Sequence, residues 1–154
     1  MLSGLWDSPY IGTDGIEDNV TIYPNAIICK GAKIGEWTTI GHNVFIGENV
    51  SIGQGCRIQG NVYIPEGVVI GNHVLIGPGV IFTNVKKPIA FIKSEYQKTI
   101  VGNKCVIGAG AIILPGIELG FSCFIGAGSV VTRPVRIGVT VYGNPAREHA
   151  ISKS

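Results

Sequence analysis

The stretch SIGQGCRIQGNVYIPEGVVIGNHVLIGPGVIFTN (Ser51–Asn84) places an isoleucine at every sixth residue until Phe82 takes its place. Helices and strands have periods of about 3.6 and 2 residues, so neither element alone produces this spacing. If the recurring residue is called position one, it is apolar in all nineteen repeats, in a chain that is 45% hydrophobic. Position one falls at Ile16, Ile22, Ile28, Ile34, Ile40, Ile46, Ile52, Ile58, Ile64, Ile70, Ile76, Phe82, Val101, Ile107, Ile113, Leu119, Ile125, Val131 and Ile137.

Each repeat reads as a short strand followed by a corner. Position five is usually Val, Ala, Cys, Thr or Ser, and it shares a face with the next position one because the two are two residues apart. Glycine often follows position one, as in GEN, GQG, GPG and GAG, where it lets the chain turn. Three corners close a triangular coil, and stacked coils pair their strands in parallel. The sequence therefore predicts an all-β parallel β-helix of about six triangular coils, with a continuous core that no single repeat could bury.

The period is interrupted once, between Thr83 and Ile100, and we expect a protruding loop there. The loop sequence carries four lysines against one glutamate. An insertion of this length in a regular solenoid usually serves a site or a contact, although a tolerated surface excursion is also compatible with it. We expect one domain over residues 1–154, made of a ragged N-terminal cap (1–15), coils (16–82 and 101–142), the loop (83–100) and a C-terminal tail (143–154).

Composition and charge exclude several classes of protein. A chain with 45% hydrophobic and 14% charged residues is not disordered. No run of 18 apolar residues is present, and MLSGLWDSPY lacks the pattern of a secretory signal, so we expect no membrane span and a cytoplasmic protein. The four cysteines form no CxxC pair. The positive charge lies in residues 85–154 without basic and aromatic clusters, which favours a phosphorylated small molecule over a nucleic acid.

The [Ile/Val]-Gly-x-x-[small/apolar]-x array, from about Ile16 to Ile137, resembles the hexapeptide-repeat acyltransferases. The resemblance implies a left-handed β-helix, an exception to the usual right-handed crossover. It also implies a homotrimer whose active sites lie between subunits.

Two glycine-rich corners and the C-terminal motif indicate a coenzyme. VIGAGAIILPG and FIGAGSVVT place small residues at consecutive corners, where a long thin ligand can lie against the backbone. Each glycine alone is also compatible with a tight turn. VYGNPAR resembles the GNPAR segment near the end of hexapeptide acetyltransferases, in which a basic residue can pair with a phosphate of coenzyme A. The expected acetyl-CoA-binding residues are Gly108, Ala109, Gly110, Ala127, Gly128, Thr132, Arg133 and Arg147.

The loop carries a closer resemblance. GPGVIFTNV…P.AFI..SEY..TIV followed by VIGAGAII is similar to acetyltransferases that modify amino groups of nucleotide-linked sugars for bacterial surface polysaccharides. It implies an acetyl-CoA-dependent N-acetyltransferase whose acceptor is a UDP- or dTDP-linked amino sugar. The expected substrate-binding residues are Thr83, Asn84, Lys86 and Tyr96, although Tyr96 is also compatible with simply anchoring the loop.

The acceptor decides which catalytic residues are needed. A hydroxyl requires a general base, usually His, whereas a neutral amine already has a lone pair. Residues 83–100 contain no His, so we expect Asn84 to orient an amine or a nearby sugar hydroxyl, unless it only caps the loop. His73, on the coil before the loop, is the second catalytic candidate, and an O-acetyltransferase would use it; a solvated corner residue is the alternative.

Two further classes of function fit the residues less well. A non-catalytic β-helix scaffold would explain the repeats but not the combination of Asn84, the loop and GNPAR. A zinc site would need several His at one place, and His42, His73 and His149 lie far apart in the sequence, so no metal is expected.

Overall fold

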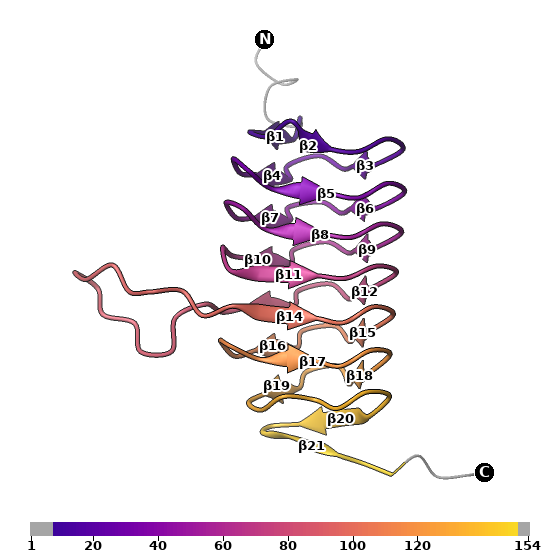
Figure 1. The fold of residues 1–154 in the computed structure, drawn as a ribbon, viewed down its shortest axis with the longest axis vertical. Helices are drawn as coiled ribbons and strands as arrows, with labels where there is room; N and C mark the ends of the chain where they lie inside the picture. The colour runs from indigo at the N-terminus through magenta and orange to yellow at the C-terminus, as the bar shows by residue number, and fades with distance from the viewer. Residues whose placement is uncertain (1–7, 151–154) are drawn as a thin grey trace.

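The chain winds into a parallel β-helix (Figure 1), and the side chains at position one form one core along its axis. The computed structural model describes residues 8–150. Position-one side chains from Ile28 to Val131 are at most 2% exposed, and each buried aliphatic side chain of this kind contributes about 1.5–3 kcal/mol to folding. The position-five residues, such as Val62 and Ala111, pack beside them. The period ends after Val131, since Ile137 is 72% exposed and Val135 bridges Leu119 in its place.

Three parallel sheets form the sides of the prism. Sheet A consists of β1 (Tyr10–Ile11), β4 (Ile27–Ile28), β7 (Phe45–Ile46), β10 (Tyr63–Ile64), β13 (Ile81–Phe82), β16 (Ile112–Ile113) and β19 (Val130–Val131). Sheet B consists of β2 (Gly15–Ile16), β5 (Lys33–Ile34), β8 (Ser51–Ile52), β11 (Val68–Ile70), β14 (Thr99–Val101) and β17 (Glu118–Leu119). Sheet C consists of β3 (Thr21–Ile22), β6 (Thr39–Ile40), β9 (Arg57–Ile58), β12 (Leu75–Ile76), β15 (Val106–Ile107), β18 (Phe124–Ile125), β20 (Thr140–Gly143) and β21 (Ala146–Glu148).

The strands make six complete coils and a seventh that has no regular strand in sheet B. Each coil takes its strands from sheets A, B and C in turn, and residues 18 apart are paired, as Phe45 with Tyr63. In Figure 1 the chain crosses the front in sheet B from left to right and returns behind as it descends, which is a left-handed coil. The predicted all-β, left-handed β-helix is therefore confirmed, with one partial coil beyond the six expected.

The corners depend on a left-handed backbone at position four of the repeat. Five asparagines adopt positive φ there, and asparagine tolerates this region better than most residues. Glycine is required at position two for a different, steric reason. A Cβ at Gly108 would lie 2.5 Å from the main-chain nitrogen of Ala127 in the next coil, so only glycine fits there.

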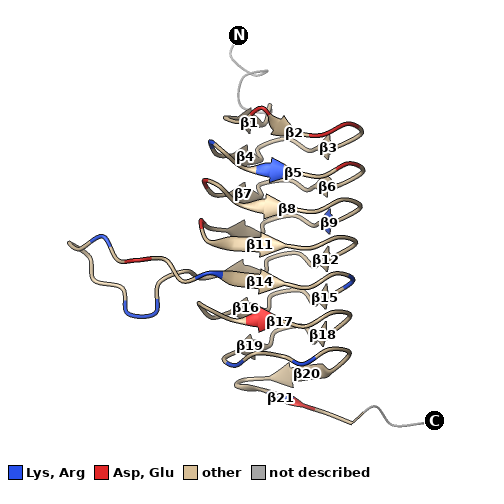
Figure 2. Ribbon diagram, in the orientation of Figure 1, with Lys and Arg blue, Asp and Glu red and all other residues tan. Residues whose placement is uncertain are grey.

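The loop leaves the prism between β13 and β14 and extends far from it (Figure 1). Its neck is closed by a 2.8 Å hydrogen bond from the main-chain N–H of Gln97 to the carbonyl of Asn84. Its tip is apolar and exposed: Phe91 is 98% exposed, Ile89 57% and Ile92 61%. Lysines dominate its charge (Figure 2).

Both ends of the prism differ from a plain coil. Strand β1 and the first residue of β2 lie in the segment expected to be a cap, of which residues 1–7 fall outside the described part. In the expected tail, β21 turns back and pairs with β20 antiparallel, which covers the last edge of sheet C. Residues 8–150 include no helix that could cross a membrane.

Candidate functional site

The predicted site residues lie on three different corners of the prism. We call them the AB corner (from a sheet A strand to sheet B), the BC corner and the CA corner. Asn84 begins the interrupted AB corner after β13, His73 belongs to the BC corner between β11 and β12, and Gly108–Gly110 form the CA corner between β15 and β16. A single chain therefore does not bring the two catalytic candidates and the glycine-rich corners together.

The CA corner presents a glycine-rich strip over three coils, on which only Pro78, Ala109 and Ala127 carry side chains. Its corners are Gly77–Gly79, Gly108–Gly110 and Gly126–Gly128, and they are stacked by hydrogen bonds from Gly110 N–H to the Pro78 carbonyl (2.9 Å) and from Gly128 N–H to the Ala109 carbonyl (2.8 Å). A Cβ at Gly79, Gly110 or Gly128 would meet no other atom within 4 Å. The predicted coenzyme residues Gly108, Ala109, Gly110, Ala127 and Gly128 are therefore adjacent, and the strip also includes Gly77–Gly79, which the sequence prediction omitted.

Two main-chain donors point to what this strip can bind. The N–H groups of Ala109 and Ala127 have no hydrogen-bond partner among residues 8–150, and both residues are exposed. An extended ligand with amide carbonyls can accept hydrogen bonds from them.

The AB corner contains a cavity of about 330 Å³ beside the neck of the loop. The cavity combines two carboxylates, an ammonium group, an amide and aromatic rings. Its lining residues are Cys29, Phe45, Gly47, Glu48, Tyr63, Pro65, Glu66, Asn84, Lys93 and Tyr96. Phe45 and Tyr63 stack with ring centroids 5.1 Å apart and form one wall.

Hydrogen bonds orient the Asn84 amide in this cavity. The side-chain Nδ2 of Asn84 donates to the main-chain carbonyl of Glu66 at 3.0 Å, and the main-chain carbonyl of Asn84 accepts from the main-chain N–H of Gln97. The side-chain Oδ1 has no partner among the described residues. Asn84 therefore offers a free hydrogen-bond acceptor, Oδ1, together with the second N–H of Nδ2.

The other predicted substrate residues divide between the cavity and its surroundings. Tyr96 lines the cavity, whereas the Thr83 hydroxyl donates to the Ile113 carbonyl (3.0 Å) and Lys86 is exposed outside it. Lys93 contributes the ammonium group. Nothing in the sequence distinguishes Lys93 from Lys86, because the path of an irregular loop sets which lysine returns to the corner.

Cys29 is the cysteine of this cavity, and it is only partly buried. Desolvation, with a smaller contribution from the negative charge of Glu48, raises the pKa of its thiol. Cys29 is therefore a poor nucleophile at neutral pH.

His73 lies on the BC corner, separated from Asn84 by the width of sheet B. It adopts a left-handed backbone (φ 56°), and its ring lies over Gly55 of the preceding coil, where no Cβ would fit. Its main-chain N–H donates to the Gln54 carbonyl at 2.8 Å. These contacts give His73 a structural role in the turn of the BC corner.

Two predicted phosphate-binding arginines meet at the C-terminal end. Arg133 follows β19 and Arg147 belongs to β21, and both line a cavity of about 220 Å³. Arg136 lines it too, but it is paired with Glu148 at 2.7 Å, which raises its pKa. Thr132 is exposed next to Arg133, outside the lining.

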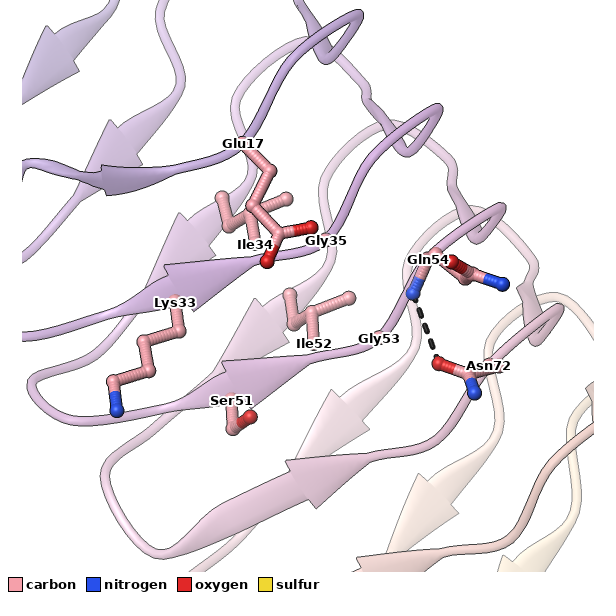
Figure 3. Close-up of a pocket in the computed structure, with 9 residues that line it drawn as sticks. All are labelled: Glu17, Lys33, Ile34, Gly35, Ser51, Ile52, Gly53, Gln54 and Asn72. Carbon is pink, nitrogen blue, oxygen red and sulfur yellow. Dashed lines mark hydrogen bonds between the residues drawn. The ribbon is translucent and has the colours of Figure 1, made fainter.

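A further cavity of about 370 Å³ lies on sheet B and the BC corner (Figure 3). Its polar side chains include Glu17, Lys33 and Ser51, and Asn72 accepts a hydrogen bond from the Gln54 main chain at 3.0 Å. None of the predicted site residues lines it. Within residues 8–150, no three His, Cys, Asp or Glu side chains converge as a metal site would require.

Comparison with known families accounts for the repeat. Residues 15–48 and 49–84 match the family described as "Bacterial transferase hexapeptide (six repeats)", and residues 98–133 match "Hexapeptide repeat of succinyl-transferase". The chain belongs to the hexapeptide-repeat transferase family. Acetyltransferases are among the solved structures that share its fold.

Several solved structures share the hexapeptide fold. A hexapeptide transferase family protein from Anaplasma phagocytophilum is 24% identical, with a TM-score of 0.76, and the match covers 95% of this chain and 84% of that one. WeeI from Acinetobacter baumannii AYE is 26% identical (TM-score 0.66; 86% and 56% covered). A mutant of GDP-perosamine N-acetyltransferase from Caulobacter crescentus, solved with CoA and GDP-perosamine, is 21% identical (TM-score 0.67; 92% and 58% covered).

This hexapeptide transferase spans little more than half the length of some of these relatives, 58% of the perosamine enzyme and 56% of WeeI. No curated protein sequence matches it significantly.

Proposed function

We propose that this hexapeptide transferase moves the acetyl group of acetyl-CoA onto the amine of a UDP- or dTDP-linked amino sugar. The product is a precursor of bacterial surface polysaccharide, made in the cytoplasm. The observation that carries the proposal is the free Oδ1 of Asn84 in a cavity whose lining includes no histidine among the described residues. An amine offers N–H groups to that oxygen and needs no general base to create its lone pair.

The reaction is an acyl transfer through a tetrahedral intermediate. The amine nitrogen bonds to the thioester carbon, the C–S bond breaks, and the departing thiolate takes the proton that the nitrogen loses. Asn84 Oδ1 accepts an N–H of the attacking amine and orients it. Fixed main-chain N–H donors are well suited to an oxyanion, and to the carbonyls of a pantetheine arm along the CA corner.

Acetyl-CoA fits the arrangement of the C-terminal half. The glycine-rich strip of the CA corner accommodates a narrow arm, with Ala109 and Ala127 as main-chain donors. Arg133 and Arg147 supply charge for the coenzyme phosphates, because guanidinium groups bind phosphate with two hydrogen bonds. In this proposal Thr132 lies at the edge of the coenzyme site, and Lys86 contacts the acceptor from the loop.

A homotrimer would complete the site. The outward row of sheet A is Tyr10, Ile27, Phe45, Tyr63, Ile81, Ile112 and Val130. Four of these side chains are 41–64% exposed, and a continuous apolar face of this kind favours association. In a cyclic trimer each copy presents different surfaces to its two neighbours. With sheet A toward the threefold axis, the AB corner of one copy adjoins the CA corner of the next, so that Asn84 faces the glycine strip and the apolar loop tip reaches a neighbour.

The same arrangement bears on the O-acetyltransferase alternative. The BC corner is opposite sheet A, so His73 would point away from the axis and from Asn84. A scaffold without activity, the other alternative, would not explain the cavity at Asn84 or the presence of Arg133 and Arg147 in one cavity.

A screen tests the proposal. UDP-, dTDP- and GDP-linked amino sugars are incubated with acetyl-CoA and the purified protein, and free thiol release is followed. We expect release with at least one amino sugar and a product that resists hydroxylamine, as an amide does. A hydroxylamine-labile ester product, or no release with any acceptor together with no binding of acetyl-CoA by calorimetry, would contradict it.

A further inference from the structure

A cavity on the CA corner, above the glycine strip, has no place in the function proposed so far. It has a volume of about 400 Å³, and Tyr23, Thr39, His42, Arg57 and Gln59 contribute its side chains. It spans the first three coils and opens between sheet C and the corner. The Tyr23 and His42 rings are in contact, with centroids 4.9 Å apart.

The chemistry of this cavity suits an anionic ligand. Its side chains carry guanidinium, imidazole, hydroxyl and amide donors, and no carboxylate of the described residues lines it. The sheet B cavity contains Glu17, and the AB cavity contains Glu48 and Glu66. Of these cavities in the N-terminal half, this one therefore repels a phosphate least.

Arg57 is the centre of that charge. It is the only arginine in residues 1–84, and strand β9 is blue in Figure 2. Its ladder neighbours on sheet C are Thr39 and Leu75, which carry no charge. The guanidinium is exposed and has no ion pair or hydrogen bond within residues 8–150. An exposed guanidinium without a partner is free to bind a phosphate bidentately.

The position of the cavity along the prism axis suits the acceptor site of a neighbouring copy. Asn84 belongs to the fifth coil, and Arg57 to the third. They are 27 residues apart at 18 residues per coil, so about one and a half coils of 4.8 Å, or roughly 7 Å along the axis, separate them, which is comparable to the length of a hexose with its first phosphate. Glu48 and Glu66 of the AB cavity disfavour a diphosphate on the copy that holds the amine.

We propose that His42 and Arg57 of one copy bind the diphosphate of the nucleotide-linked acceptor whose amine is held at Asn84 of the adjacent copy. The inference rests on the proposed function and adds the site of its anionic group. Arg57 binds the phosphate oxygens, the His42 ring donates a further hydrogen bond, and the carboxylates at the AB corner keep the amine end in register.

Calorimetry with the intact protein tests the site directly, with UDP and dTDP as probes. We expect the Kd of Arg57→Gln to rise at least tenfold, as for loss of a hydrogen bond to a charged group. Lys33→Gln is the matched control, because it removes a positive charge from sheet B, and its Kd stays within twofold. Equal binding to Arg57→Gln and the wild type, or no binding to the wild type, would overturn the inference.

Mixed oligomers test the sharing between copies. Arg57→Gln and Asn84→Ala chains are co-expressed and assayed with limiting acceptor. A mixed trimer has an interface with an intact Asn84 from one chain and an intact Arg57 from the other, so activity recovers above that of either variant alone. No recovery would overturn the assignment to adjacent copies.

The proposed function fails separately from this inference. Acetyl transfer to an amino sugar without a nucleotide needs Asn84 but not Arg57. If that transfer occurs and the Arg57→Gln Kd is unchanged, only the inference is wrong. If no amino sugar is acetylated while UDP binding still depends on Arg57, the proposed function is wrong and the anion site stands.

Discussion

The Nδ2 of Asn84 donates a 3.0 Å hydrogen bond to the main-chain carbonyl of Glu66, one coil earlier, and this leaves Oδ1 as the free end of the amide. In the proposed function Oδ1 orients the attacking amine, so Asn84→Ala is expected to lower kcat/KM for the amino sugar by about tenfold to a hundredfold, with KM for acetyl-CoA unchanged. Asn103→Ala, the same change on the BC corner, is the control and should stay within twofold. Initial-rate kinetics decide, and a change below twofold in Asn84→Ala would show that it only caps the loop.

His73→Asn is expected to leave N-acetylation within twofold of the wild type. Asparagine tolerates the left-handed backbone that His73 adopts (φ 56°), so the corner is preserved while the imidazole is removed. The measurement is the pH profile of kcat/KM. A loss of more than tenfold in kcat/KM would instead favour His73 as the general base.

Larger side chains on the CA corner should block binding of the coenzyme. Ala109→Phe and Ala127→Phe are expected to raise KM for acetyl-CoA at least tenfold, since both side chains point into the strip that a pantetheine arm would occupy. Folding is unaffected, because Phe121 already stands at the same repeat position on the BC corner. Glu36→Phe at that corner controls for an added ring. Unchanged KM values with unchanged melting temperatures would place the coenzyme elsewhere.

Arg133→Gln should distinguish acetyl-CoA from acetylpantetheine, which lacks the coenzyme's nucleotide and its phosphates. We expect KM for acetyl-CoA to rise about tenfold while turnover of acetylpantetheine is unchanged. Arg136→Gln is a suitable comparison, because Glu148 already occupies that guanidinium. An equal effect of Arg133→Gln on both donors would mean that Arg133 acts through the structure of the C-terminal end.

Alkylation of cysteine reports on the AB cavity. Cys29 is partly exposed, whereas Cys56, Cys105 and Cys123 are at most 2% exposed, so iodoacetamide should label Cys29 first. Because burial and Glu48 raise the pKa of this thiol, the thiolate is scarce at neutral pH, and labelling should keep accelerating above about pH 9.

Mass spectrometry measures the rate of this labelling at each pH. Glu48→Gln removes the charge that opposes ionisation and should shift the profile to lower pH. Bound acceptor should protect Cys29. A profile that levels off at the pH of an ordinary thiol would contradict the assignment of a raised pKa.

The repeat was predictable because one residue of each hexapeptide packs into the core. Ile58, Ile76 and Ile107 all fill the same core, so the six-residue period of the sequence is also the period of the structure. The end of the period was not predictable in the same way. Ile137 fits the pattern, yet Pro134 and the strand β20 change the path, and Val135 enters the core instead.

The placement of residues on corners was only partly predictable. Residues 18 apart share a corner, so the repeat spacing by itself separates His73 from the glycine strip. Two other features had no signal in the sequence. Arg133 and Arg147 line one cavity because β21 returns antiparallel to β20. Lys93 rather than Lys86 lines the AB cavity because the path of the loop is irregular.

Val68 pairs with Thr99 although the loop lies between them in the chain, and the coil resumes after Gln97 as if nothing had intervened. The protruding segment is thus a graft on a scaffold that does not need it. If the loop helps to select the acceptor as proposed, its sequence can change that preference without altering the strand pairing beneath it.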